Sequence, residues 1–312
     1  MKAVRFDQYG GIDVLAVTDV PRPEPGPGQV LVKVKAASIN PGEAKIREGM
    51  LHALFPATFP SGEGTDLAGI VEAGDPGTTG FAGVSFAPGT EVIGWVDTRS
   101  SHAEYALVEA ASLVPKPAGV RWEVAGAIPV AGFTAWAAVR AVGGKPGEVV
   151  VVSGAAGGVG SIAVQLAGST GATVIGLASP ANHEWLAAHG VIPVAYGDGV
   201  AGRIKAAAPG EKADAFIDTH GGGYVELALD ELGIAPERVD TIARFDAVAK
   251  YGVKAEANAA GASAGTLAEL AALIADGDLE IPVAATYPLA EVRAAYRELE
   301  GGHVRGKIVL IP

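Results

Sequence analysis

Hydrophobic and polar residues alternate in short runs over roughly the first third of the chain. In VLVKVKAASI (residues 30–39) valines stand at 30, 32 and 34, with lysines at 33 and 35, and this period of two predicts a half-buried strand. Similar runs at residues 69–74, 91–96 and 103–110 are separated by Gly, Pro and Asp, which are turn formers. The pattern predicts a mainly β region that ends near Pro115.

Beyond Pro115 the pattern changes to strands that alternate with helical segments of about ten residues. VVVVSG, TVIGLAS, PVAY and ADAFIDT are the strand-like runs, and SIAVQLAGS, NHEWLAAHG and GVAGRIKAAA lie between them with helical spacing. Such alternation is typical of βαβ units around a parallel sheet. We therefore predict an α/β protein in which a doubly wound parallel sheet domain accompanies a mainly β domain.

A glycine-rich loop, GAAGGVG (Gly154–Gly160), joins the first of these strands to its helix. Its glycines at 154, 157 and 160 form GxxGxxG rather than the commoner GxGxxG, but the strand–loop–helix context is that of a dinucleotide site. The glycines permit a tight turn, a close approach to the pyrophosphate and helix packing on the sheet. The alternative is a turn without a ligand. The predicted contact residues are Gly154, Ala156, Gly157, Gly158, Val159 and Gly160.

The end of the next strand bears on the choice of cofactor. NAD is usually recognised there by a carboxylate that accepts from the ribose 2′-OH, but the strand is followed by Ser179, Asn182 and His183, and the first carboxylate is Glu184. Small polar residues and a histidine suit a 2′-phosphate, so we predict NADP(H). The alternative is that Ser179 only caps the following helix and His183 is solvated.

Composition excludes several classes of function. The 312-residue chain has a formal net charge of −12, which opposes binding to nucleic acid because that affinity depends on Lys and Arg. It has no cysteine, which excludes disulfides, thiolate metal sites and a cysteine nucleophile. No apolar run reaches the roughly 18 residues of a membrane span. We expect a cytoplasmic protein with no membrane or nucleic-acid partner.

Several motifs together resemble the zinc-independent quinone oxidoreductase branch of the medium-chain dehydrogenase/reductase superfamily. They are VLVKVKAASINPGEAKIREG, FPSGEGTDLAGIVEAG, AGFTAW, GAAGGVGSIAVQLA and YPLAEVRAAYRELEGGHVRGKIVL. The resemblance implies a Rossmann domain at residues 119–258 and a GroES-like substrate domain from residues 1–118 and 259–312. It also implies a homodimer that transfers a hydride from NADPH to a quinone or an α,β-unsaturated carbonyl.

The resemblance assigns roles to three further residues. Asn40 is similar to a family residue beside the nicotinamide and the substrate, where its amide would donate to a substrate oxygen; alternatively it holds the turn before Pro41. Thr134 resembles a threonine near the nicotinamide, or is a packing residue of its helix. Tyr196 resembles a tyrosine near the adenine ribose, although the chain before it is one residue shorter than is usual in the family.

Other polar residues leave alternatives open. A proton for the reduced acceptor comes from solvent or from Lys45, whose alternative is a solvated helix face. Asp218 either caps its strand end or faces the cofactor, and Gly221 suggests a close backbone approach to the nicotinamide ribose. Arg305 or Lys307 offers a contact to a phosphate, or the two residues only decorate the terminal turn. Tyrosine donors are excluded where some relatives carry them, because Lys45 and Leu51 stand at those places.

The leading hypothesis is an NADPH-dependent, metal-free reductase of quinones or enones. Zinc catalysis is disfavoured because the cysteine ligands of zinc-dependent relatives are missing. One alternative is an enoyl-thioester reductase, which needs a basic groove that the acidic composition does not suggest. The other is an NADPH-binding redox sensor with little turnover.

Overall fold

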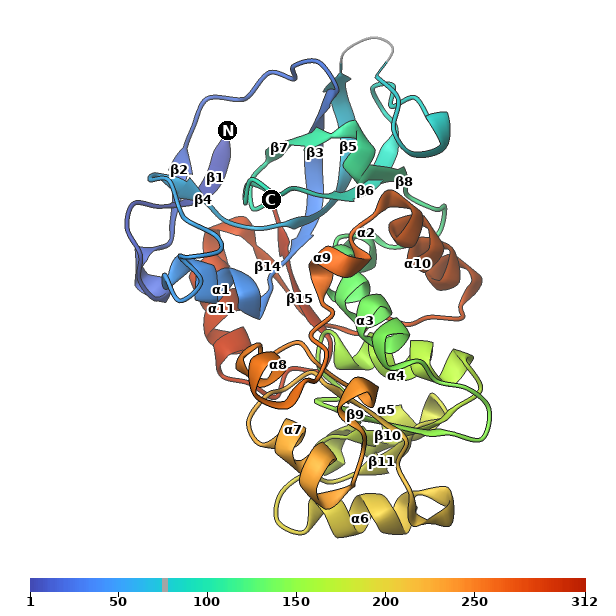
Figure 1. Ribbon diagram of the computed structural model, residues 1–312. Coiled ribbons are helices and arrows are strands. Elements are labelled where there is room, and N and C mark those ends of the chain that lie inside the picture. Colours follow the sequence, from blue (N-terminus) through green and yellow to red (C-terminus); the bar gives the residue numbers. More distant parts are fainter. Residues whose placement is uncertain (75–77) are drawn as a thin grey trace. The chain divides into compact units, whose positions relative to one another are not determined.

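The computed structural model describes residues 1–74 and 78–312, which divide into two compact units (Figure 1). The first unit comprises Met1–Val130 and Ser263–Pro312, and the second comprises Ala131–Ala262. The boundaries predicted from the sequence lay at 118/119 and 258/259. Residues up to 130 join the first unit because the turn after helix α2 (Trp122–Ala125) packs on a strand: the Ser38 N–H donates to the Gly126 carbonyl at 3.1 Å.

The described residues of the first unit form two sheets. A three-stranded sheet has the order β2-β1-β4, and a larger sheet has the order β14-β15-β3-β5-β6-β8, with β7 also paired to β3. The strands are β1 (Lys2–Phe6), β2 (Ala16–Asp19), β3 (Gln29–Ser38), β4 (Ser61–Gly62), β5 (Asp66–Gly74), β6 (Glu91–Trp95), β7 (Tyr105–Glu109), β8 (Leu113–Pro115), β14 (Val283–Pro288) and β15 (Lys307–Ile311). The segment that follows residue 262 thus completes the sheet started by the N-terminal segment.

Strand β3 differs from its prediction. Its valines are buried as expected, but Leu31 on the opposite face is only 2% exposed. β3 pairs with β5, β7 and β15, so its edges are occupied. On the same face as Leu31, Lys33 is exposed, as the period of two predicts, so this face is covered only in part.

In the described part of the first unit, three α-helices accompany α2: α1 (Pro41–Arg47), α10 (Ala264–Asp276) and α11 (Val292–Glu300). Helix α1 begins at Pro41 because the preceding residue, Asn40, forms a capping box with Glu43, and the fixed φ and missing N–H of Pro41 suit the first position of a helix. Helix α11 packs Val292, Ala295 and Tyr296 into the apolar core beside β1 and β15.

The second unit contains a five-stranded parallel sheet with the order β11-β10-β9-β12-β13. Its strands are β9 (Val149–Ser153), β10 (Thr173–Leu177), β11 (Ile192–Val194), β12 (Ala215–Asp218) and β13 (Val239–Thr241). Its helices are α3 (Pro129–Val142, which starts two residues before the boundary), α4 (Gly160–Ser169), α5 (His183–Ala188), α6 (Val200–Ala207), α7 (Tyr224–Glu226), α8 (Asp246–Tyr251) and α9 (Asn258–Gly261). The order is that of the first five strands of a Rossmann fold.

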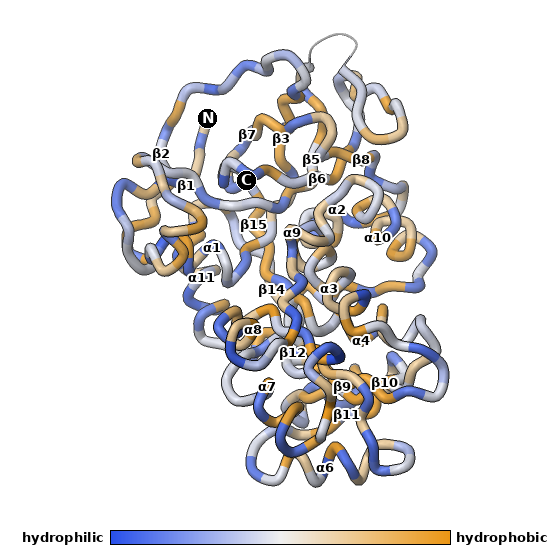
Figure 2. The backbone as a smooth tube through the Cα atoms, in the orientation of Figure 1, coloured by the Kyte–Doolittle hydropathy of each residue, from blue (hydrophilic) through white to orange (hydrophobic). Residues whose placement is uncertain are grey.

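The core of the second unit explains its strand sequences. Every residue of β9 is buried, as continuous apolar runs in parallel sheets require, and the tube in Figure 2 is coloured hydrophobic along β9, β10 and β11. The α/β class predicted from the sequence, with a doubly wound sheet beside a mainly β region, is confirmed.

Candidate functional site

The glycine loop folds back on the start of helix α4 in the second unit. A Cβ on Gly160 would lie 2.1 Å from the Gly154 carbonyl oxygen, and Gly154 itself has a φ of +58°. A Cβ on Gly157 would meet only the Gly154 oxygen, at 3.3 Å. The loop is therefore packed inward at Gly154 and Gly160 and open outward at Gly157. An open backbone at a helix N-terminus is suited to bind a pyrophosphate.

The loop lies where the sheet reverses its order, between β9 and β12. Thr219, directly after β12, donates its hydroxyl to the Ser153 carbonyl oxygen at 2.7 Å, and its N–H donates to Ser153 Oγ at 3.0 Å. These bonds tie together the two loops that leave the carboxyl ends of β9 and β12. In doubly wound sheets ligands bind at this switch point.

Asp218 holds the second of these loops. The carboxylate is fully buried, and its Oδ1 accepts hydrogen bonds from Ser153 Oγ at 2.7 Å, the His220 N–H at 3.1 Å and the Gly221 N–H at 2.9 Å. Thr241 donates to Oδ2 at 2.8 Å. Of the two predicted roles, capping is the one its contacts fulfil. Because the N–H of Gly221 is engaged by Asp218, contact of Gly221 with a ligand would use its other backbone atoms.

The residues after β10 form a small polar group. Asn182 donates from Nδ2 to Ser179 Oγ at 3.1 Å, and His183 donates from Nε2 to the Ala178 carbonyl oxygen at 3.2 Å. Ser179 precedes a short 3-10 helix but makes no side-chain capping bond to it. The group thus brings Ser179 and Asn182 together at the strand end.

Tyr196 and Thr134 occupy different environments in the second unit. Tyr196 is 45% exposed and lies on the loop after β11. The sequence did not lead us to expect that Arg203 contacts this loop. The Arg203 guanidinium donates to the carbonyl oxygens of residues 195, 197 and 198 at 2.7–3.1 Å, which fixes this loop. The sequence signal that could have identified Arg203 is an arginine one turn into a helix that follows a Gly-Asp-Gly turn. Thr134, in contrast, is buried on α3, with 5% of its surface exposed.

Asn40, in the first unit, lies in a buried polar cluster. Its Nδ2 donates to Asp66 Oδ2 at 2.9 Å and to Glu43 Oε1 at 3.2 Å, and its Oδ1 accepts from Lys307. Both amide hydrogens are therefore engaged within the protein. Donation to a substrate oxygen would require one of these bonds to be exchanged. The alternative role, holding the turn before Pro41, is fulfilled by the capping box.

Lys307 is the residue of this cluster that sequence reasoning misplaced. Its side chain is 4% exposed, and Nζ donates to the Ile39 carbonyl oxygen at 3.1 Å and to Asn40 Oδ1, 3.7 Å from Asp66 Oδ2. Burial lowers the pKa of Lys307. It neither decorates the surface nor is free to meet a phosphate. Its position at the start of an apolar strand was the available signal, because a lysine buried in a strand needs an acidic partner.

Lys45 projects from the exposed face of α1, whereas Glu43, Ala44 and Arg47 of the same helix are buried. Among residues 1–74 and 78–312, no group of three or more His, Asp or Glu side chains is placed to hold a metal ion. None of the described helices is both long and apolar enough to span a membrane.

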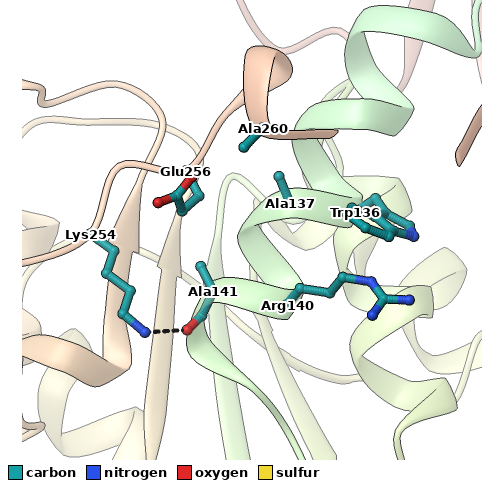
Figure 3. Close-up of a pocket in the computed structure, with 7 residues that line it drawn as sticks. All are labelled: Trp136, Ala137, Arg140, Ala141, Lys254, Glu256 and Ala260. Atoms are coloured by element: carbon teal, nitrogen blue, oxygen red, sulfur yellow. Dashed lines mark hydrogen bonds between the residues drawn. The ribbon is translucent and has the colours of Figure 1, made fainter. Parts of the chain in front are cut away.

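A hollow of about 340 Å³ opens beside the edge of the sheet in the second unit (Figure 3). It is lined by Trp136, Ala137, Arg140, Ala141, Lys254, Glu256 and Ala260. Lys254 follows the outer edge of β13, where its N–H donates to the Val239 carbonyl oxygen. The glycine loop instead follows the carboxyl end of β9, so this hollow is separate from the switch point.

Next to this hollow, Asp240 is fully buried in β13. Its Oδ1 accepts from the Glu256 N–H at 2.7 Å, while Oδ2 has no hydrogen-bond partner within the described part of the chain. Burial raises the pKa of Asp240 from 3.8 to about 7. Asp240 therefore carries a proton in weakly acidic solution.

Replacing Asp240 by Asn is expected to remove part of the pH dependence of stability. Folding raises the pKa of this carboxyl from 3.8 to about 7, so its protonation stabilises the folded state. This stabilisation is complete below pH 3.8, the pKa in the unfolded state, and is lost as the pH rises to about 7, the pKa in the folded state. Over this window the free energy of unfolding of the wild type should fall by roughly 3–4 kcal/mol more than that of Asp240→Asn. Urea unfolding across the window measures both, and parallel pH profiles would contradict the prediction.

Comparison with known proteins identifies the family. Residues 26–142 match the alcohol dehydrogenase GroES-like domain, and residues 186–310 match the zinc-binding dehydrogenase family. The quinone oxidoreductase of Pseudomonas aeruginosa is 30% identical over 338 aligned residues, which cover 100% of this chain and 99% of that protein. The chain belongs to the quinone oxidoreductase branch of the medium-chain dehydrogenase/reductase superfamily.

Solved structures support the same placement. The quinone oxidoreductase from Coxiella burnetii superposes with a TM-score of 0.87 at 30% identity, covering 100% of this chain and 99% of that one. An NAD-dependent alcohol dehydrogenase gives a TM-score of 0.87 at 29% identity, with 100% of each chain covered. Membership of this superfamily makes the protein an oxidoreductase and implies a nicotinamide cofactor.

Proposed function

We propose that this quinone oxidoreductase homologue is an NADPH-dependent reductase that transfers a hydride to a quinone or an α,β-unsaturated carbonyl without a metal ion. The observation that carries the proposal is the open glycine loop at the switch point of a Rossmann sheet, in a chain related over its whole length to a protein named quinone oxidoreductase. The absence of cysteine from the sequence supports the metal-free reaction.

The residues present fit a dinucleotide. We propose that the backbone of Gly157, Gly158 and Val159 binds the pyrophosphate, while Gly154, Ala156 and Gly160 let the loop fold closely enough to do so. Ser179, Asn182 and His183 would surround the 2′-phosphate, with no carboxylate before Glu184 to repel it. When bound, the dihydronicotinamide supplies the hydride. Thr134, Tyr196 and the backbone of Gly221 are proposed to contact the rest of the cofactor.

The acceptor is proposed to meet the cluster around Asn40. The Lys307 ammonium bound to Asn40 Oδ1 polarises the amide, which makes its N–H groups better donors toward a developing anion. An amide hydrogen exchanged from Glu43 or Asp66 to the acceptor oxygen would stabilise that anion. The proton follows from solvent or from Lys45. We extend the proposal to a protein that lies in the cytoplasm and forms a homodimer. Light scattering of the purified protein tests the dimer.

The test is steady-state oxidation of NADPH and NADH with 1,4-benzoquinone, 9,10-phenanthrenequinone, 2-cyclohexenone and a crotonyl thioester. We expect turnover of a quinone or the enone with NADPH preferred. Turnover of the thioester alone would establish an enoyl-thioester reductase instead. Tight NADPH binding without turnover of any acceptor would contradict the proposal in favour of a redox sensor.

Replacing Ser179 by Asp is expected to weaken NADPH binding at least about tenfold while leaving NADH binding within about threefold. The new carboxylate would lie beside the 2′-phosphate, where like charges repel, but could accept from a 2′-OH. Titration of intrinsic tryptophan fluorescence gives both dissociation constants. Ser169→Asp, at the exposed far end of α4, is the matched control. Equal weakening for both cofactors would contradict the 2′-phosphate assignment.

A further inference from the structure

A second group of buried charges adjoins Asn40 in the first unit. Arg47 of α1 is fully buried, and its guanidinium donates to Glu63 Oε1 at 2.8 Å and to Glu300 Oε1 at 3.1 Å. The same guanidinium lies 4.6 Å from the centre of the Tyr296 ring. Glu63, which stands in the loop between β4 and β5, is 1% exposed. A carboxyl this deep is retained only with partners.

Tyr296 connects this group to Asn40. Its hydroxyl is buried on α11, donates to Glu43 Oε2 at 3.0 Å and also neighbours the Glu63 carboxyl. Glu43 in turn accepts from the Asn40 N–H at 2.8 Å and from Asn40 Nδ2 at 3.2 Å. A line of contacts therefore runs from Glu63 through Tyr296 and Glu43 to Asn40.

The buried charges do not balance unless one carboxyl is protonated. Glu43, Glu63 and Asp66 are at most 4% exposed, and the equally buried lysine and arginine side chains among residues 1–74 and 78–312 are two, Arg47 and Lys307. Three carboxylates against two cations leave one negative charge in excess, and Glu300 on Arg47 adds to the negative side. An uncompensated charge in such an interior is costly, and a carboxyl avoids that cost by binding a proton.

The hydrogen bonds identify which carboxyl holds the proton. Glu43 accepts from Asn40, the Thr65 N–H and Tyr296, and Asp66 accepts from Ser38, Asn40 and the Val130 N–H. Each oxygen of Glu43 and Asp66 accepts from at least one N–H group, which can only donate. Glu63 differs, because among the described residues its Oε2 is buried without a partner. Glu63 is therefore the carboxyl to which we assign the proton.

We propose that Glu63 holds a proton at neutral pH and, through Tyr296 and Glu43, acts as a positioning residue for Asn40 in the reduction. The inference rests on the proposed function only in giving Asn40 its role. A neutral Glu63 does not compete for the single phenolic hydrogen of Tyr296, which is donated to Glu43 Oε2. Burial and the neighbouring Glu43 raise the pKa of Glu63 from 4.5 to about 8, which agrees with this arrangement.

Loss of the proton from Glu63 disturbs the contacts that run through Tyr296 and Glu43 to Asn40. The groups that face Glu63 are Arg47 and Glu43 from α1, Tyr296 and Glu300 from α11, and His102, whose N–H donates to the Glu63 carbonyl oxygen. As a carboxylate, Glu63 competes with Glu43 for the one phenolic hydrogen and repels it. The hydrogen bonds from Asn40 to Glu43 then weaken, so kcat declines as the pH rises through about 8.

The first experiment is the pH profile of kcat for NADPH oxidation with a quinone. With a pKa of about 8 the protonated fraction of Glu63 falls about tenfold from pH 7 to pH 9, and we expect kcat to fall similarly. Glu63→Gln is a permanently neutral donor, so its ratio of kcat at the two pH values should be close to one. Glu24→Gln, at an exposed position, should decline like the wild type. A tenfold decline in Glu63→Gln would overturn the positioning role.

The second measurement does not depend on turnover. Infrared difference spectra of the wild type should show the carbonyl band of a protonated carboxyl that disappears with a midpoint near pH 8, and Glu63→Gln should lack it. Persistence of that band in the variant, or its absence from the wild type, would refute the assignment of the proton. If no acceptor is reduced at all, the proposed function fails while this spectrum still decides the state of Glu63.

Tyr296→Phe provides a second variant if Glu63→Gln does not fold. It keeps the ring against Arg47 and removes only the hydroxyl that links Glu63 to Glu43. We expect the infrared band to remain and the tenfold decline of kcat to disappear. If kcat of Tyr296→Phe still falls tenfold from pH 7 to pH 9, the proton of Glu63 acts by another route, and the proposed role of Tyr296 is overturned.

Discussion

Replacing Gly160 by Ala is expected to raise the dissociation constant for NADPH at least about a hundredfold, equivalent to about 2.7 kcal/mol. The new Cβ would lie 2.1 Å from the Gly154 carbonyl oxygen and 2.9 Å from the Ala155 Cα. Both are backbone atoms that cannot rotate away, so the loop must separate from α4 and lose the geometry proposed to bind the pyrophosphate. Titration of the fluorescence of Trp136 and Trp185 measures the affinity.

Gly168→Ala is the matched control on the same helix. A Cβ there meets nothing within 4 Å, and alanine is the better helix former by roughly 0.5–1 kcal/mol. This variant should bind NADPH like the wild type and unfold at the same or a higher temperature. Wild-type affinity in Gly160→Ala would show that the loop tolerates the displacement, and would count against its role as the pyrophosphate site.

Replacing Asp66 by Ala is expected to lower the free energy of unfolding by about 3–5 kcal/mol, the usual cost of removing one partner of a buried ion pair. Asp66 is fully buried, accepts from Ser38, Asn40 and the Val130 N–H, and lies 3.7 Å from the Lys307 ammonium. Without it the Lys307 charge loses its nearest carboxylate and three donors lose their acceptor. Urea unfolding at neutral pH measures the loss.

Asp19→Ala provides the control for this prediction, because Asp19 also pairs with a lysine, Lys2 at 2.7 Å, but both side chains are more than half exposed. An exposed pair contributes at most about 1 kcal/mol. Removal of the buried cation as well, in the double variant Asp66→Ala with Lys307→Met, should recover part of the loss. Equal effects of Asp66→Ala and Asp19→Ala would refute the account of Asp66 as the partner of a buried charge.

The features that the sequence predicted well are local. The glycine loop, its buried strand and the following helix occupy about twenty consecutive residues, and their spacing alone predicts a strand, a turn and a helix in that order. In these segments each residue is constrained mainly by its neighbours in the chain, so a linear pattern is sufficient.

The polar cluster around Asn40 could not be predicted because its members are distant in the chain. Lys307 is 267 residues from Asn40, and Tyr296 is 253 residues from Glu43. The start of an apolar strand indicates that Lys307 is buried, and Tyr296 has the pattern of an ordinary helix tyrosine, but neither segment shows which residues are its partners. Only the pairing of β15 with β3 brings them together, and a single sequence carries no direct record of such pairings.

The same pairing affects the order in which the protein can fold during synthesis. The second unit is one continuous segment, Ala131–Ala262, and all five of its strands have left the ribosome before β14 and β15 are translated. The first unit must wait, because β15 lies between β14 and β3 and carries the ammonium group that balances Asp66. Until Lys307 emerges, the nascent N-terminal sheet holds a carboxylate without its cation and an unpaired edge on β3. The second unit is therefore expected to fold first, and the first unit only once β15 has emerged from the ribosome, an interval in which chaperones have their greatest effect.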